Sequence, residues 1–177
     1  AHLARGHHQG NQGSGVAVRV SIASEENLLA SALRRAIRNA EPEAVPRVSD
    51  MPAIAASTLG KIELESYEDA DDEALLEKLS RSAVSNVFRR HLDSSEFADL
   101  VGRYDSGHSF EASDRLASGE YVVEADQFPE LAVAMQRLKV KPSPAMTASV
   151  YEFVLEGLHL GKRLNKSRVS TGNLYGG

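Results

Sequence analysis

The sequence predicts a mainly α-helical protein, a bundle of five or six helices with at most short extended segments. Apolar residues recur at three- and four-residue spacing along several long segments, which is the spacing that makes one face of an α-helix apolar. The apolar residues are chiefly Val, Leu and Ala, because aromatic residues make up only 6% of the 177 residues and Trp is absent. This composition favours the packing of helices over a rigid aromatic core.

Six segments are predicted as helices from the spacing of their apolar residues and from the residues that begin or end them. They cover residues 24–39, 50–59, 71–92, 95–104, 126–138 and 144–160. The first begins at Ser24, a favourable N-cap, and has Glu25 and Glu26 in its first turn, where acids suit the helix dipole. The second has Pro52 in its first turn, where proline is tolerated, and Gly60 as its stop.

The later helices are predicted on the same grounds. Residues 71–92 carry a continuous apolar stripe, with acids crowded at the start and Arg89 and Arg90 near the end, as the helix dipole favours. The next helix is expected to stop at residues 105–107, whose sequence is Asp-Ser-Gly. The apolar spacing that predicts the last helix continues to Leu160.

Extended structure is expected only in short pieces. Residues 61–65 alternate between charged and apolar side chains and read equally well as a brief strand or as a linker. Val122 and Val123 favour a β-strand but stand alone, beside a single turn expected within residues 111–119. Residues 13–22 are read as a flexible Ser/Gly turn followed by an extended segment, and residues 1–9 as the end of a helix.

Three regions are expected along the chain. They are a helical region over residues 1–65, a helical extension over residues 66–161 and a flexible basic tail over residues 162–177. The boundary near residue 65 lies where the composition turns acidic, because residues 51–100 hold 11 Asp and Glu against 5 Lys and Arg. The chain begins with Ala and reads as part of a longer protein.

Composition excludes several classes of function. The formal net charge is −5, whereas a general nucleic-acid binder usually carries a strongly basic face. The chain has no Cys, which removes disulfides, thiolate metal sites and Cys nucleophiles. No run of about 18 apolar residues exists to span a membrane, and no secretory signal is visible, so a cytoplasmic location is expected.

No pattern of residues predicts a catalytic or metal site. The phosphate loop G-x-x-x-x-G-K-[ST] and the nucleophile motif G-x-S-x-G are both absent. His2, His7 and His8 read as a solvated terminus, and the acidic residues of 63–77 as a solvated face, because neither set has metal-ligand spacing. The basic residues of 162–168 read as part of a soluble terminus.

Arg19 is the single candidate site residue. It lies four residues after Gly15 of the Ser/Gly turn and precedes a long amphipathic helix. A guanidinium is always charged and can donate two parallel hydrogen bonds to phosphate oxygens. An arginine held in this way is what a nucleotide sensor of a larger ATPase needs. A surface arginine in an extended segment is the plainer interpretation.

Several stretches resemble magnesium-chelatase-like AAA+ ATPases, relatives of the ATPase subunit of magnesium chelatase. The similar stretches are NQGSGVAVRVSI at 11–22, the helix at 26–36, PRVSD at 46–50, LGKIELE at 59–65 and FVLEGLHL at 153–160 with KRLNK at 162–166. The resemblance is best over residues 9–66 and 150–166. It does not extend through residues 90–145.

The resemblance implies that the chain is the helical lid and C-terminal extension of such an ATPase. Arg19 then looks like the lid arginine that senses the γ-phosphate of ATP, while the phosphate loop and the Mg²⁺-binding carboxylate lie upstream. ATP and Mg²⁺ are therefore expected only in the full-length protein, and this chain alone is expected neither to bind them nor to be catalytic. The implied partners are the upstream core, neighbouring subunits of a ring and a protein client.

Two other functions stay open. The chain fits a stand-alone helical protein-interaction module that uses the acidic residues of 63–77. More weakly, it fits a helical transcriptional regulator that uses the basic tail. A phosphate-loop motif upstream of Ala1 would favour the ATPase, and a start codon close to Ala1 would favour the interaction module.

Overall fold

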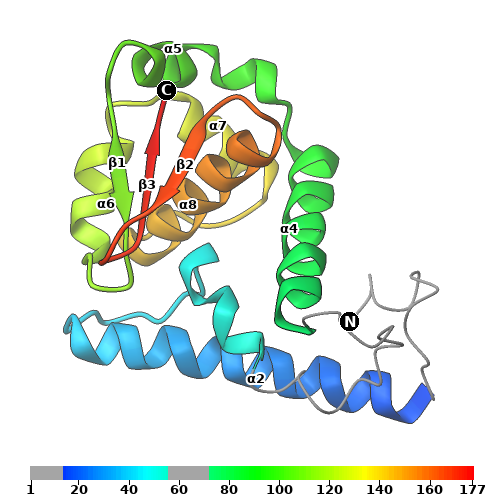
Figure 1. Cartoon of the computed structure of the whole chain (residues 1–177). Helices are drawn as coiled ribbons and strands as arrows, with labels where there is room; N and C mark the ends of the chain where they lie inside the picture. Colours follow the sequence, from blue (N-terminus) through cyan, green and yellow to red (C-terminus); the bar gives the residue numbers. More distant parts are fainter. Residues whose placement is uncertain (1–13, 56–71) are drawn as a thin grey trace.

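The computed structural model describes residues 14–55 and 72–177, and helices dominate them (Figure 1). In chain order the elements are α2 (Ser14–Arg38), η1 (Val48–Ile54), α4 (Asp72–His91), η2 (Ser94–Phe97), α5 (Ala98–Asp105), β1 (Phe110–Ala112), α6 (Ser118–Ala125), α7 (Glu130–Arg137), α8 (Pro144–Leu160), β2 (Asn165–Arg168) and β3 (Asn173–Gly176). The mainly helical fold class is confirmed. None of the helices in these two ranges has both the length and the apolar character that crossing a membrane requires.

Helix α8 forms the centre of the fold. It packs on α6, α4, α7 and η1, and most of its side chains are buried on every side. Ser143 caps its start by accepting a hydrogen bond from the Met146 amide at 3.1 Å, and Pro144 occupies the first turn, where its missing N–H is not needed. A helix that is apolar all round is stable only in such an interior position.

Aromatic side chains fill the space around α8, contrary to the expectation of an aliphatic core. Tyr104, Tyr121, Phe128 and Tyr151 are all buried, and the Tyr104 and Tyr151 hydroxyls are hydrogen-bonded at 2.9 Å. The Tyr121 ring meets the Tyr151 ring edge-on with centroids 6.5 Å apart. Each such pair adds about 0.5–1.5 kcal/mol beyond its buried area. The aromatic residues are few, but the fold concentrates them in one place.

The residues expected to form a flexible tail instead form part of the core. Strand β3 lies between β1 and β2 in an antiparallel sheet, with Phe110 opposite Tyr175. The Tyr175 and Leu164 side chains are buried. At Gly172 a Cβ atom would lie 2.2 Å from the Ala112 carbonyl oxygen, so the close approach of the two backbones requires glycine there.

Of the other predicted helices and strands, some are confirmed and some are wrong. The helices expected over 71–92 and 144–160 are confirmed, and the one over 95–104 is present as η2 followed by α5. The isolated strand at Val122 and Val123 is wrong, because both residues lie in α6. Packing of that turn against α8 overrides their β-propensity.

Beginnings of helices were predicted less well than their centres. Helix α2 starts at Ser14, so Ser24 lies inside the helix and is not its N-cap, and the extended segment over 13–22 is wrong from Ser14 onward. Helix α7 starts at Glu130 instead of residue 126. The helix end at 1–9, the strand or linker at 61–65 and most of the acidic run lie outside the described residues. The division at residue 65 stays a prediction.

Helix α2 lies along one edge of the molecule, with the other described elements on one side of it (Figure 1). It contacts η1 directly, and η1 in turn contacts α8. The large C-terminal region therefore supports α2 from one side only, which makes the residues between α2 and α8 important for its position.

Candidate functional site

The candidate Arg19 lies on α2 and its side chain is exposed. The sequence placed it in an extended segment, and this is wrong because the helix already starts at Ser14. Alternating valines read as extended by propensity alone, but helix propensity differs by only a few tenths of a kcal/mol between most residues and is overridden by context. The structure leaves the proposed nucleotide-sensing role of Arg19 untested.

A second group of polar residues, which the sequence did not predict, lies between α2 and the C-terminal region. We call it the junction cluster and define it as Ser31, Arg35, Glu41, Arg47, Ser49, Asp50, Ser118, Tyr121 and Glu152. Arg35 and Arg19 are separated by 16 positions, or about 24 Å along the helix axis at 1.5 Å per residue. Arg19 and the junction cluster are therefore separate sites.

Arg35 ties α2 to the segment that follows it. Its guanidinium donates to an Asp50 carboxylate oxygen at 3.0 Å, to the Val45 carbonyl at 2.6 Å and to Glu41 at 3.4 Å. Asp50 also accepts from the Ser31 hydroxyl at 2.9 Å. Arg35 and Asp50 are almost completely buried, and removing one partner of such a pair typically costs about 3–5 kcal/mol.

Arg47 continues the junction cluster toward α6. It donates to the Ser118 hydroxyl at 2.7 Å and to the Leu116 carbonyl at 2.9 Å, and its side chain is buried. The guanidinium also lies over the Tyr121 ring, 4.5 Å from the centroid, where a cation meets the negative face of the aromatic ring. One side chain therefore joins the loop after α2 to the start of α6.

Glu152 connects the junction cluster to α8. Its carboxylate accepts from the Tyr121 hydroxyl at 2.5 Å and from the Ser49 amide and hydroxyl at 2.8 and 3.1 Å. Burial raises the pKa of the Glu152 carboxyl, while the hydrogen bonds from Tyr121 and Ser49 and the positive charge of Arg47 oppose that rise. Burial also raises the pKa of Tyr121, so its hydroxyl stays protonated and donates.

One turn further along α8, Glu156 makes a similar connection to the C-terminal strands. It accepts from the Tyr175 hydroxyl at 2.7 Å and pairs with Lys166 at 2.8 Å. Residues four apart lie on one face of a helix, so Glu152 and Glu156 place two buried carboxylates side by side. Each carboxylate holds a different neighbour, the loop after α2 in one case and the terminal strands in the other.

The junction cluster positions parts of the protein, and its geometry does not indicate catalysis. Its charged groups are buried and bonded chiefly to one another, which keeps them away from a substrate in solvent. The Glu152 carboxyl, whose pKa is raised, could serve as an acid or base only if substrate reached it. Two nitrogens of the junction cluster, Arg35 Nε and Arg47 Nε, are buried and have no hydrogen-bond partner within the described residues.

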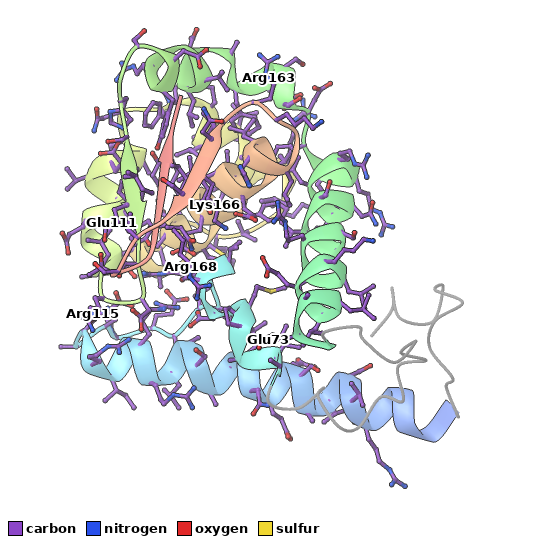
Figure 2. All side chains as sticks on the ribbon, in the orientation of Figure 1. Glu73, Glu111, Arg115, Arg163, Lys166 and Arg168 are labelled. Atoms are coloured by element: carbon purple, nitrogen blue, oxygen red, sulfur yellow. The ribbon has the colours of Figure 1, made fainter. Side chains whose placement is uncertain are left out.

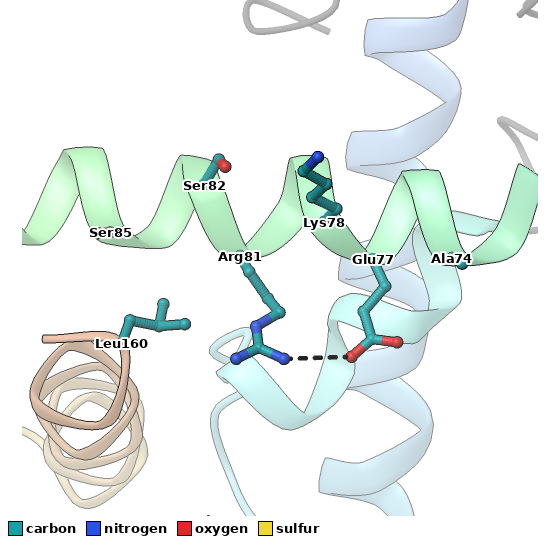
Figure 3. Close-up of a pocket in the computed structure, with 7 residues that line it drawn as sticks. All are labelled: Ala74, Glu77, Lys78, Arg81, Ser82, Ser85 and Leu160. Atoms are coloured by element: carbon teal, nitrogen blue, oxygen red, sulfur yellow. Dashed lines mark ion pairs between the residues drawn. The ribbon is translucent and has the colours of Figure 1, made fainter. Parts of the chain in front are cut away.

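Two open hollows on the surface involve other residues. One is lined chiefly by α4, with Glu77, Lys78 and Arg81 on its wall and Leu160 at its end (Figure 3). Arg81 there pairs with Glu77 at 3.8 Å, and both side chains are largely exposed. The other hollow lies along α5 and reaches His108. Neither hollow contains a residue of the junction cluster.

The histidines and the basic tail form no common site in the part of the chain that is described. His108 contacts Glu124 at 2.6 Å, while the His159 ring lies 3.1 Å from the Leu164 carbonyl, and no group of three potential metal ligands occurs in residues 14–55 and 72–177. Figure 2 shows Arg163 and Arg168 near opposite ends of β2, with Lys166 between them. Since Lys166 is paired with Glu156, the basic tail residues do not form one free patch.

The junction cluster could hardly have been found from the sequence. Arg34 and Arg35 are adjacent and chemically identical, yet Arg34 is exposed and Arg35 is buried. The partner residues are spread from Ser31 to Glu152. One local signal is the pair Glu152 and Glu156, which lie four residues apart in a mostly apolar helix. A carboxylate that is buried in such a helix needs a hydrogen-bond or ion-pair partner.

Comparison with known proteins adds no assignment. No protein-family model, no curated protein and no solved structure matches this chain.

Proposed function

We propose that this chain is the helical lid and C-terminal extension of a magnesium-chelatase-like AAA+ ATPase. In this role it contributes nucleotide sensing and subunit contacts to an assembly that remodels a client protein or inserts a metal ion. Its partners are an upstream ATPase core and neighbouring subunits of a cytoplasmic ring. The chain alone hydrolyses no ATP, because the phosphate loop and the Mg²⁺-binding carboxylate belong to that core.

The placement of Arg19 is the observation that carries the proposal. The side chain is exposed near the start of a long helix, and it makes no hydrogen bond or ion pair within residues 14–55 and 72–177. A free guanidinium in such a position can donate to phosphate oxygens brought by another part of the protein. Arg19 supplies only one part of a nucleotide site. We therefore assign ATP and Mg²⁺ binding to the full-length protein only.

The junction cluster supports the lid role mechanically. Arg35 holds the loop after α2, and Arg47 and Ser49 hold α6 and α8. A displacement of α2 on nucleotide binding would therefore be passed to the C-terminal region instead of being absorbed by a loose hinge. A lid that transmits the state of its nucleotide requires a stiff connection of this kind.

The test is ATP hydrolysis by the full-length protein carrying Arg19→Ala or Arg19→Lys. We expect kcat to fall by about tenfold or more in Arg19→Ala, which corresponds to about 1.4 kcal/mol of lost transition-state stabilisation, with partial recovery in Arg19→Lys. Arg90→Ala is the matched control, because Arg90 is also an exposed helical arginine. The melting temperature should be unchanged in all three variants.

Two outcomes would contradict the proposal. One is a kcat in Arg19→Ala equal to that of wild type. The other is ATP hydrolysis by the isolated chain at a rate comparable with an intact ATPase. An upstream coding sequence without a phosphate-loop motif would remove its basis.

A stand-alone helical interaction module is the second candidate. The specific observation that favours it is that α2 exposes several large apolar side chains, among them Leu29, Leu33 and Ile37. Exposed apolar patches on one helix face commonly mark sites of protein contact. A start codon close to Ala1 together with normal folding of the chain alone would select this function over the first.

A further inference from the structure

Residues 14–55, which we call the arm, add nothing to the hydrophobic core that surrounds α8. Within the part of the chain that the structure describes, every side chain of that core comes from residues 88–175. The arm packs chiefly on itself, because the main contacts of α2 are with η1. Its own buried apolar side chains are those of Val20, Ala32 and Ala36. The region of residues 72–177 therefore has a core that does not depend on the arm.

The buried ion pairs of the junction cluster lie inside the arm. They are Arg35 with Asp50 at 3.0 Å, Arg35 with Glu41 at 3.4 Å and Arg47 with Glu41 at 3.3 Å. Among the described residues, the one ion pair that joins the arm to residues 72–177 is Arg38 with Asp114, and both side chains are half exposed. Separation of the arm would therefore part no buried ion pair, which is the costly step when a buried charge loses its partner.

Hydrogen bonds join the arm to the rest of the protein, and they come from residues 38–49 of the arm. The Ser49 amide donates to Glu152 at 2.8 Å, and the Ser118 amide donates to Glu41 at 2.5 Å. Each of these bonds uses a side chain on at least one side. None of the backbone–backbone hydrogen bonds found in residues 14–55 and 72–177 joins the two parts. Water can replace such partners when the two parts separate, so the net cost of each bond is modest.

We propose that the arm separates from the region of residues 72–177 as one unit, in a local opening of the folded protein that does not require global unfolding. In the open state Arg47 keeps its ion pair with Glu41, and Glu152 keeps the hydrogen bond from Tyr121. The closed state is the stiff connection described above, and opening interrupts it. The arm is thus a conformational device with two discrete states.

Native-state hydrogen exchange, followed by NMR on the 177-residue chain, tests the opening without any substitution. The amides of Ser49 and Ser118 are the probes, because they donate across the junction from opposite sides. The amide of Leu155, a fully buried core residue in the middle of α8, is the reference for global unfolding. We expect one common protection factor for the two probes, at least about 100-fold below that of Leu155. The protection of the probes should also depend less on urea, because opening exposes less surface than global unfolding.

A substitution remote from both probes tests whether the arm moves as one unit. Ser149→Ala removes the hydrogen bond from the Ser149 hydroxyl to the Pro46 carbonyl, which is 2.6 Å long and involves neither Ser49 nor Ser118. It should lower the protection of the two probes by the same factor, about fivefold. Ser106→Ala, which removes an exposed hydroxyl bond outside the junction, is the matched control and should change neither probe.

A second substitution separates opening of the arm from global unfolding. Tyr175→Phe removes the hydrogen bond to Glu156, and both residues lie within the region of residues 72–177. This region is folded in the closed and in the open state, so the variant destabilises both states equally. The protection of Leu155 should therefore fall by about tenfold or more, while that of the two probes stays unchanged.

Three results would overturn the proposal. If Ser49 and Ser118 are as protected as Leu155, or if Tyr175→Phe lowers all three protections alike, the junction opens only in global unfolding. If Ser149→Ala changes one probe and not the other, the two probes report separate local motions. If neither probe is protected in wild type, the closed state is not the main state in solution. These measurements need no nucleotide, so their outcome is independent of the role proposed for Arg19.

Discussion

The two sides of the junction between α2 and α8 are stabilised by different physics. The region from α4 to β3 is held by buried aromatic and aliphatic side chains packed around α8, such as Tyr151 and Leu155. The region from α2 to η1 buries small or polar side chains, and its position depends on Arg35, Asp50 and Arg47. The first region has a core of its own, whereas the second is attached to that core by charge.

This difference explains the orientation of α2. Apolar contact is not directional, so it specifies the orientation of a helix less strongly than hydrogen bonds do. Hydrogen bonds from a guanidinium fork are directional, and Arg35 has three acceptors at fixed places around it. The junction cluster therefore fixes which face of α2 points inward, and the side chains of Leu29, Leu33 and Ile37 are left exposed.

The largest expected effect comes from breaking the attachment itself. Arg35→Met keeps a long apolar side chain but leaves the Asp50 carboxylate buried without its cation. We expect the free energy of unfolding to fall by about 3–5 kcal/mol in urea titrations. Arg38→Met is the matched control: its partner Asp114 is exposed, so the loss should stay below about 1 kcal/mol. Equal losses in the two variants would show that burial of the Arg35 pair is unimportant.

A smaller loss of stability is expected when the hydrogen bond between β3 and α8 is removed. Tyr175→Phe removes the hydroxyl that donates to buried Glu156, and should lower the free energy of unfolding by about 1.5–3 kcal/mol. Ser106→Ala removes an exposed hydroxyl bond to the Gly102 carbonyl and should change it by about 0.5 kcal/mol or less. If Tyr175→Phe is as mild as Ser106→Ala, the hydrogen bond from Tyr175 to Glu156 does not stabilise the fold.

The smallest expected change in the free energy of unfolding concerns Glu152, and it depends on pH. Its pKa is raised in the folded state, so the folded protein binds more protons than the unfolded chain and stability falls as pH rises above about 4.3, the usual value for an unfolded Glu. Glu152→Gln keeps an acceptor for Tyr121 and removes this loss, so its stability relative to wild type should rise from acid to neutral pH. Urea titrations at several pH values measure the difference. Glu120→Gln, at an exposed position, controls for loss of charge, and an unchanged pH profile in Glu152→Gln would refute the assignment.

Regular elements were predictable where the signal was local. The α8 sequence carries Ser143 and Pro144 at its start and apolar residues throughout, so spacing and capping sufficed. The sheet was not predictable in this way, because Phe110 and Tyr175 pair across 65 positions and each strand has only three or four residues. A short polar segment rich in Gly reads as a loose end until its distant partner is known.

The candidate site shows the same limit. Sequence reasoning selected Arg19 because its neighbours look unusual, and it predicted one apolar helix face from the spacing of Leu29, Ala32, Leu33, Ala36 and Ile37. The structure buries only the two alanines of that set, so spacing gave the face but not the part of it that points inward. In the structure that direction is set by Arg35 and its partner Asp50, which lies fifteen positions further along the chain. A charged residue inside a helix was thus more informative about orientation than the apolar residues around it.

Cysteine labelling distinguishes the buried and exposed sides of α2, because the chain contains no Cys of its own. Leu33→Cys and Ala32→Cys are prepared, and the rate of maleimide labelling is measured at a concentration where the chain is monomeric. Ala32 is fully buried and Leu33 is half exposed. We expect labelling of the cysteine at position 33 nearly as fast as in the unfolded chain and strong protection at position 32. Protection at both positions, or faster labelling at position 32, would contradict it.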